Sequence, residues 1–196
     1  MKKISILAVM LALFASCCLA QSRILPAQVD VRYISQISNA TVGSCGCFTM
    51  EGGGVDANWK LAGFQQQHAL IGVVADFAAD HTGKVNNADY GLTLSTFTFG
   101  PRFTVATKRV NIFGQGLFGV AHGSRSQFPS GNSLVPSANS FAMALGAGAD
   151  LPVSPRVSLR LPQIEYLHTR LPNTTSNWQN NLRLGVGITM NLSKKK

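Results

Sequence analysis

Residues 179–192 read QNNLRLGVGITMNL, and from Leu182 onward apolar side chains alternate with polar, charged or absent ones. Successive side chains of an extended chain point to opposite faces, so Leu182 and Leu184 would share one face and Arg183 and Gly185 the other. A strand this long with one apolar face and one polar face is typical of a transmembrane β-barrel, which turns its apolar side chains outward to lipid. This segment therefore predicts an all-β membrane protein.

The start of the chain predicts export. Two lysines precede an apolar run over residues 4–15, and the small residues 16–20 follow it. This order is that of a secretory signal peptide covering residues 1–20, with cleavage after Ala20. The apolar run is too short for a membrane-spanning helix, which needs about 20 residues. A lipoprotein cleaved before Cys17 is the alternative.

Residues 21–196 are expected to form one β-barrel domain, because period-two patterns recur along them and helical periodicity is nearly absent. The formal charge of +9 would fall to +7 when Lys2 and Lys3 are removed with the signal peptide. A basic balance can indicate nucleic acid as a partner, but no stripe of aromatic and basic residues and no Gly-rich phosphate loop is present. Lipid phosphate is the expected partner, and nucleic acid is not.

Eight period-two segments predict eight antiparallel strands in an up-and-down barrel, and eight is an even number that can close. The expected strands cover residues 27–37, 49–61, 68–79, 91–105, 109–121, 140–151, 156–170 and 179–192. The connections between them alternate in length. Short turns are expected at residues 62–67, 106–108 and 152–155, and mostly longer polar loops at 38–48, 80–90, 122–139 and 171–178. Short periplasmic turns and long extracellular loops alternate in this way in bacterial barrels.

The seventh segment changes its inward and outward parity along its length. Leu159 is outward with Arg160 inward, yet farther along Ile164 is outward with Glu165 inward. One extra residue at Leu161 or Pro162 would restore both faces, and proline is tolerated in strands mainly at edges and bulges. We therefore predict a β-bulge there.

Parity along the strands places acidic and basic side chains together inside the barrel. The predicted luminal charge network consists of Asp30, Arg32, Asp56, Lys60, Asp76, Arg102, Asp150, Arg160, Glu165 and Arg183. The interior of an eight-stranded barrel is only wide enough for its own side chains, and buried charges must be paired. A lumen filled by ion pairs is favoured over a gate or proton relay. Inward glycines at positions 72, 100, 119, 146, 148, 185 and 187 would make room for the long side chains.

Outward aromatic residues fall near the strand ends, as in the aromatic girdles at membrane surfaces. Trp59 and Phe103 are expected at the periplasmic side, and Phe77, Phe141, Tyr166 and Trp178 at the outer side.

Cys45 and Cys47 lie in the first expected outer loop, and an oxidising compartment favours a disulfide between them. The close spacing strains such a bridge, although Gly46 gives the chain freedom. Metal capture by the two thiolates is the alternative, but no third and fourth ligands are evident. The sequence predicts no metal and no cofactor.

Three histidines, His81, His122 and His168, fall near the expected outer ends of strands. His122 and Ser124 resemble the His-x-Ser pair of outer-membrane lipid A deacylases, in which a histidine activates a serine. Such a site also needs an acidic partner nearby, and the next acid along the chain is Asp150, at the opposite rim. We therefore expect no enzyme and assign no catalytic residues, with a lipid A-modifying hydrolase as the least favoured alternative.

Several stretches together resemble the small outer-membrane β-barrel proteins of the OmpA-like, porin-family kind. They are VVADFAADH (73–81), FTFGPRFT (97–104), FGQGLFGVAHG (113–123), ALGAGADL (144–151) and the whole of residues 160–192. The resemblance implies an eight-stranded barrel in the outer membrane and carries over no catalytic residues. This chain departs from that pattern at its last strand, which ends on Leu192 where such barrels usually end on an aromatic residue.

The expected role is structural or a surface interaction through the outer loops, with a narrow channel or small-ligand carrier as the alternative. The expected partners are outer-membrane lipids, lipopolysaccharide and an extracellular ligand bound by the loops. The barrel is expected to be a monomer.

Overall fold

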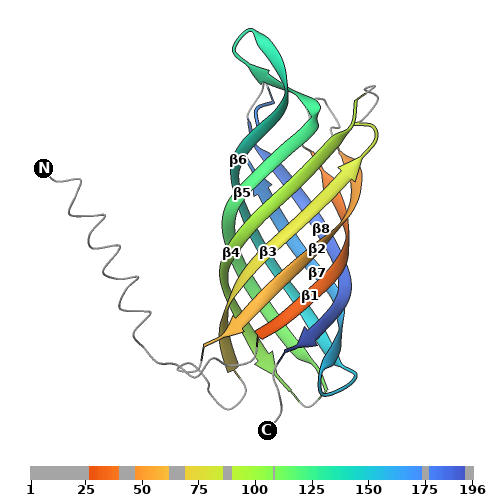
Figure 1. Cartoon of the computed structure of the whole chain (residues 1–196), viewed down its shortest axis with the longest axis vertical. Coiled ribbons are helices and arrows are strands. Elements are labelled where there is room, and N and C mark those ends of the chain that lie inside the picture. The colour runs from red at the N-terminus through yellow and green to blue at the C-terminus, as the bar shows by residue number, and fades with distance from the viewer. Residues whose placement is uncertain are drawn as a thin grey trace, which may run out of the picture.

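The chain forms a closed, antiparallel, eight-stranded barrel (Figure 1). The computed structural model describes residues 27–39, 47–61, 69–85, 90–107, 109–173 and 177–192. The strands are β1 (Ala27–Ser38), β2 (Phe48–Lys60), β3 (Ala69–Thr82), β4 (Leu92–Ala106), β5 (Asn111–Ser130), β6 (Ser133–Pro152), β7 (Val157–Thr169) and β8 (Gln179–Asn191). Each strand pairs with its neighbours in sequence, and β1 pairs with β8 to close the barrel. The predicted fold class is confirmed, whereas the predicted signal peptide lies outside the described residues.

Within those ranges, no helix is long and apolar enough to cross a membrane. The two ends of the barrel differ. At one end β1 begins and β8 finishes, and we call it the terminus end. At the other end β5 continues into β6 through a hairpin that extends past the other strands (Figure 1). We call this the hairpin end.

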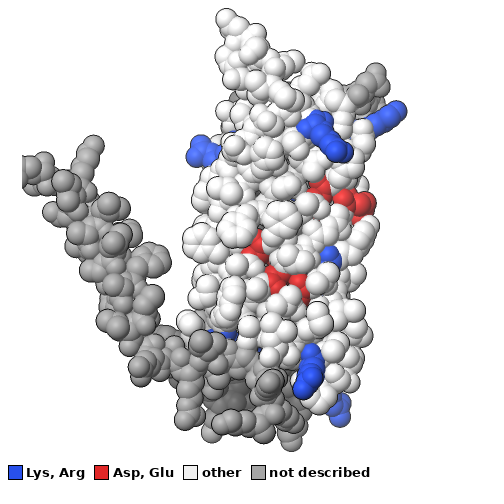
Figure 2. Space-filling view, in the orientation of Figure 1, with Lys and Arg blue, Asp and Glu red and all other residues white. Residues whose placement is uncertain are grey.

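Side chains alternate between lumen and outer surface as the sequence predicts. On β8, Leu182 and Leu184 are 42% and 44% exposed, whereas Arg183 between them is 3% exposed. The expected girdle residues Trp59, Phe103, Phe77, Phe141, Tyr166 and Trp178 are all exposed. In Figure 2 the wall between the two ends is mostly white apart from some red patches, and the blue Lys and Arg atoms lie mainly toward the ends. An outer surface of exposed apolar side chains around a polar interior is the reverse of a soluble barrel and suits a lipid environment.

The predicted bulge in β7 is present. Arg160 pairs with Gly187 and Gln163 with Gly185, so three steps along β7 match two steps along β8. The pairing with β6 shifts at the same place, where Ile164 faces Ala147 and Leu161 faces Ala149. The extra residue lets Arg160 and Gln163 both point inward, with Leu161 and Pro162 exposed between them.

The expected long loop at residues 122–139 is wrong. β5 and β6 instead continue through this region as a two-stranded ribbon, with Gly131 and Asn132 at its turn. Gly131 has a φ of 59°, which suits a tight hairpin turn. Beyond the barrel neither face of the ribbon lies against lipid, so the residues there do not show the alternation that reveals the other strands. β3 likewise continues to Thr82, into the expected loop 80–90.

Candidate functional site

The lumen contains the predicted charged side chains, and Asp56 is the centre of their contacts. Its carboxylate oxygens lie 2.8 Å from Nη2 of Arg102 and 2.7 Å from Nη1 of Arg160. Nη1 of Arg32 is 3.3 Å away. Arg32 also donates to Asp76 and, at 3.4 Å, to Asp30. Strands β1, β2, β3, β4 and β7 are therefore joined through one group of buried charges.

Two arginines pack against one aromatic ring inside the barrel. The guanidinium carbons of Arg102 and Arg160 lie 4.5 Å and 4.7 Å from the centre of the Phe113 ring. Arg160 also holds Asp150 with two nitrogens, at 2.8 and 3.2 Å. Phe113 was not singled out from the sequence, although its parity on β5 places it inward. The ring provides a cation–π contact to charges that carboxylates reach from other sides.

Arg183 forms a second group nearer the hairpin end. Its Nη2 lies 2.6 Å from an oxygen of Asp80, and its Nη1 lies 3.5 Å from Glu165. Its Nε donates to Gln36 at 2.6 Å. Asp80 was missed in the sequence because it was placed in a loop, and extending the expected strand 68–79 by one residue would have found it. The lumen thus holds a sixth acid beyond the five expected.

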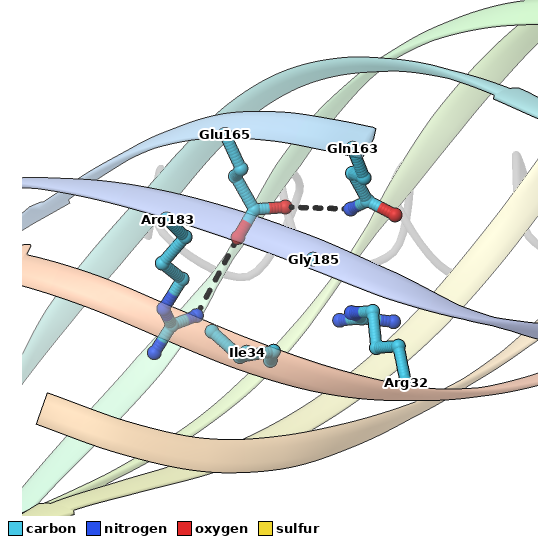
Figure 3. A pocket seen from close by; sticks show the side chains of 6 residues that line it. All are labelled: Arg32, Ile34, Gln163, Glu165, Arg183 and Gly185. Carbon is cyan, nitrogen blue, oxygen red and sulfur yellow. Dashed lines mark hydrogen bonds and ion pairs between the residues drawn. The ribbon is translucent and has the colours of Figure 1, made fainter. Parts of the chain in front are cut away.

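Glu165 connects the two groups of charges (Figure 3). One of its carboxylate oxygens faces Arg183, and the other accepts from Gln163 at 3.4 Å. Gln115 donates to the same oxygen at 3.2 Å and accepts from Arg102. A cavity of about 10 Å³ lies beside these residues, lined by Arg32, Ile34, Gln163, Glu165, Arg183 and Gly185. A cavity of this size is at the lower limit for holding one water molecule.

Lys60 is the predicted network residue that the ion pairs do not include. It is the last residue of β2, at the terminus end, where it is half-buried and inward by parity. Among the described residues it has no acidic partner within ion-pair distance. A flexible ammonium at the barrel mouth can keep its hydration, so it needs no buried partner.

Some of the expected glycines do make room for long side chains. A Cβ at Gly148 would come within 2.7 Å of the Phe113 ring, whereas one at Gly187 would first meet the Val31 carbonyl oxygen at 2.4 Å and then Cβ of Arg32 at 2.8 Å. Gly185 lies beside Arg32 as well. Gly100 and Gly119 instead face the backbone of a neighbouring strand, so their lack of a side chain serves close strand packing.

The sequence predicts a lumen filled by ion pairs, but ion pairs do not fill its whole length. Toward the hairpin end it is packed with apolar side chains, none more than 6% exposed. They are Met50, Val74, Val85, Leu92, Leu94, Leu117, Ala121, Phe128, Ala142, Ala144, Leu167 and Leu171. Phe128 comes from the ribbon, and Val85 and Leu171 come from connections at this end. We call this set the apolar plug, because it fills much of the lumen toward the hairpin end, beside buried polar side chains such as Thr169, Gln179 and Asn181.

The three histidines lie on the outer surface. They are on β3, β5 and β7, the strands that run from the terminus end to the hairpin end. Each Nδ1 is within hydrogen-bond distance of a polar side chain on the next strand: His81 with Thr93 at 2.9 Å, His122 with Asn139 at 2.6 Å, and His168 with Asn180 at 3.1 Å. The cross-strand partners fix the rings against the barrel wall. This accounts for their position by local polar contacts near a membrane surface.

His122 and Ser124 lie on the outward face of β5, opposite Ser95 and Thr93 of β4. No hydrogen bond joins His122 to Ser124 in the described part of the chain. The group that orients His122 is the amide of Asn139, where the comparable catalytic arrangement uses a carboxylate.

Cys47 is exposed just before β2, and Cys45 lies outside the described residues. The disulfide between them stays a prediction. Among the residues that the structure describes, no three His, Cys, Asp or Glu side chains are grouped so as to hold a metal ion.

Comparison with known proteins matches the fold but no family. No protein-family model and no curated protein matches the sequence. Among solved structures, Neisserial surface protein A (NspA) aligns with a TM-score of 0.61 at 15% identity, covering 84% of this chain and 96% of NspA. Ail, the attachment invasion locus protein of Yersinia pestis, in complex with the heparin analogue sucrose octasulfate, aligns with a TM-score of 0.56 at 17% identity, covering 85% and 97%.

The outer membrane enzyme PagL aligns with a TM-score of 0.51 at 13% identity, covering 84% of this chain and 99% of PagL. The fold is that of a small outer-membrane β-barrel. At these identities the likeness extends to the fold alone, and these neighbours include both surface proteins and an enzyme.

Proposed function

We propose that this barrel resides in the outer membrane, with its hairpin end outside the cell, and acts by presenting that end to extracellular ligands. The observation that carries the proposal is the β5–β6 ribbon, which projects past the barrel while the lumen beneath it is packed. Ser133 and Leu134 near its tip are exposed, Leu134 by 61%. An exposed apolar side chain on a projecting ribbon is available for contact with a partner.

Charge at the hairpin end favours an anionic ligand. Lys84 and Arg125 are both exposed there, and Glu51 is the exposed acid among the described residues. Arg125 sits at the irregularity where the β5–β6 pairing shifts and has a φ of 58°. Ail, which shares the fold, was solved with a sulfated heparin analogue. A sulfated glycan is therefore a suitable first probe for this surface.

The test removes the ribbon tip without opening the lumen. Phe128 and Val135 face each other across the ribbon, so replacing residues 129–134 with Asn-Gly would close a two-residue hairpin there and keep Phe128 in the plug. We expect the shortened barrel to fold normally and to bind immobilised heparin more weakly, because it keeps Lys84 and Arg125 but lacks the projecting tip. Arg125→Gln should weaken binding severalfold, whereas Arg156→Gln, in the turn at the terminus end, should not.

Unchanged binding by the shortened barrel and by Arg125→Gln would contradict the proposal. The matched comparison of Arg125 with Arg156 separates a local contact from the general effect of removing one positive charge.

A narrow channel is the alternative function. The plug side chains are at most 6% exposed, and the polar side chains beside them, such as Thr169, Gln179 and Asn181, are buried and hydrogen-bonded. Because the lumen is packed at this level, we expect no single-channel steps in planar bilayers from the wild-type barrel. Reproducible conductance whose ion selectivity changes in Arg102→Ala or Glu165→Ala would favour the channel instead.

A lipid-ester hydrolase is supported by one contact, the hydrogen bond that orients His122. We expect no such activity, because no hydrogen bond joins His122 to Ser124 in the described residues and an amide stabilises a protonated imidazole less than a carboxylate does. Hydrolysis of lipid A acyl esters by the purified barrel, abolished in Ser124→Ala, would assign this activity and its serine.

A further inference from the structure

Five outward side chains form a compact cluster on β7, β8 and the connection between them, at the hairpin end. We call it the rim cluster, and it consists of Tyr166, His168, Arg170, Trp178 and Asn180. Asn180 Oδ1 accepts from the Tyr166 hydroxyl at 2.6 Å and lies 3.1 Å from Nδ1 of His168. The His168 ring meets the Trp178 ring edge-on, with centroids 5.4 Å apart. These contacts hold the two rings in a defined orientation.

Arg170 lies over this platform. Its guanidinium carbon is 5.6 Å from the centre of the Trp178 ring. Its backbone N–H donates to the Ser140 hydroxyl at 3.3 Å, which ties the end of β7 to β6. The cation is thus placed by both a ring contact and a backbone contact, and its side chain stays exposed.

The Arg170 guanidinium has no acidic partner in the described part of the chain. Six of the described acids point into the lumen, and the seventh, Glu51, lies on the outside of β2. β2 pairs with β1 and β3, whereas β7 and β8 pair with each other, β6 and β1. Glu51 is also engaged by Tyr33 and Ser35 of β1. The positive charge of Arg170 is therefore available to an anion from outside the protein.

The position of the cluster indicates which anion. Below it on the same strands, Ile164, Leu182 and Leu184 are exposed apolar side chains that suit hydrocarbon. Tyr166 and Trp178 stand at the level where aromatic rings meet lipid headgroups. Arg170 lies beyond Tyr166 and His168 toward the hairpin end, where the charged groups of membrane lipids are phosphates.

We propose that the rim cluster binds a phosphate group of a glycolipid in the outer leaflet of the membrane. Arg170 supplies the charge-assisted hydrogen bonds, which its planar guanidinium can make in pairs to phosphate oxygens. Trp178 and Tyr166 pack against the body of the lipid. This site lies on the lipid-facing wall, separate from the ribbon tip, and it does not depend on that tip binding a ligand.

The test uses Trp178 as its own reporter. The chain has two tryptophans, and the other is Trp59, which is toward the terminus end of β2. A Trp59→Phe background therefore leaves Trp178 as the fluorescent group. Titration of this barrel in detergent micelles with bisphosphorylated lipid A should give a saturable change in emission. Arg170→Gln should raise the lipid A concentration at the midpoint about tenfold, as expected for loss of a charged hydrogen bond.

Arg170→Lys should recover part of the affinity, and Arg156→Gln is the matched control and should stay within about twofold of the parent. Equal midpoints for Arg170→Gln and Arg156→Gln would overturn the proposal. So would equally tight binding of lipid A from which both phosphates have been removed.

Inorganic phosphate is the third arm. Saturation by millimolar phosphate with the same dependence on Arg170 would show a site for a soluble anion and overturn the assignment to a lipid. The barrel with the shortened ribbon retains the rim cluster, so its lipid titration should match that of the parent. Failure here is thereby distinguishable from failure of the proposed surface function.

Discussion

Asp56 forms ion pairs with more arginines than any other acid among the described residues. Three arginines from β1, β4 and β7 approach its carboxylate. Exchanging a complete buried ion pair for apolar groups often costs little, but removing one partner leaves the other charges buried and uncompensated. Removing one charged residue of this network should therefore destabilise the barrel more than replacing a complete ion pair by apolar groups.

Asp56→Asn should lower the free energy of unfolding by about 3–5 kcal/mol, because it leaves arginines with too few carboxylates. The measurement is urea unfolding of the barrel in detergent micelles. Glu51→Gln changes an outward carboxylate that two hydroxyls contact at the surface and should cost less than about 1 kcal/mol. Equal losses for the two variants would contradict a special role for the buried carboxylate.

At the scale of the strand, the bulge in β7 accommodates Pro162 as an extra residue. The side chains after the bulge therefore still point to their correct faces, polar ones to the lumen and apolar ones outward. Pro162 lacks an amide hydrogen and lies next to the extra residue, so its missing donor causes no gap in regular pairing. Inward positions on both sides of the bulge contribute to the charge network, namely Arg160 before it and Gln163 and Glu165 after it.

Deleting Pro162 should remove the bulge and leave a regular strand. All the remaining side chains of β7 would keep their inward or outward direction. We expect this deletion to fold, with a change in unfolding free energy of about 1–2 kcal/mol. Deleting Val186 from β8, which has no such irregularity, would turn part of the strand inside out and place leucines in the charged lumen. Folding of both variants to the same extent, judged by their migration on gels, would contradict this view of the bulge.

The ribbon formed by β5 and β6 has unpaired edges, and proline stands on each of them. Ser130 and Ser133 flank the two-residue turn and so exchange hydrogen bonds, which directs the backbone N–H positions of the residues next to them outward. Pro129 is one such residue, and Pro136 is another by alternation along β6. The missing donors make each edge a poor template for a second copy, and the monomer stays a prediction.

At the scale of the whole molecule, ring closure leaves the barrel itself without an edge strand. Sodium dodecyl sulfate should therefore open it only slowly at room temperature. We expect unboiled protein to migrate differently from boiled protein on denaturing gels. An identical position before and after boiling would be evidence against a closed barrel.

Alternation alone was enough to predict most of this barrel. The inward and outward faces, the closing number of strands and the bulge at Pro162 follow from the period of two, since lipid selects apolar side chains on every outward position. The same reasoning placed ten charged residues inside the barrel, and nine of them take part in the ion-pair network.

What alternation could not reveal lies where lipid no longer constrains the outer face. Asp80 and the ribbon at residues 122–139 are at or beyond the hairpin end, where polar residues suit both faces. The apolar plug was missed for a different reason. Leu94 and Leu117 point inward, yet the expectation of a polar lumen assigned apolar residues to the outside.

An ion pair and a hydrogen bond between side chains on the two sides of the β1–β8 seam bear on how the barrel is assembled. Arg160 of β7 reaches Asp30 of β1, and Arg183 of β8 donates to Gln36 of β1. Until β1 and β8 pair, these polar groups lack their partners on the other side of the seam. An open sheet would therefore carry them into the bilayer without those hydrogen bonds. Partly inserted intermediates are therefore costly, and insertion and closure should occur as one concerted event.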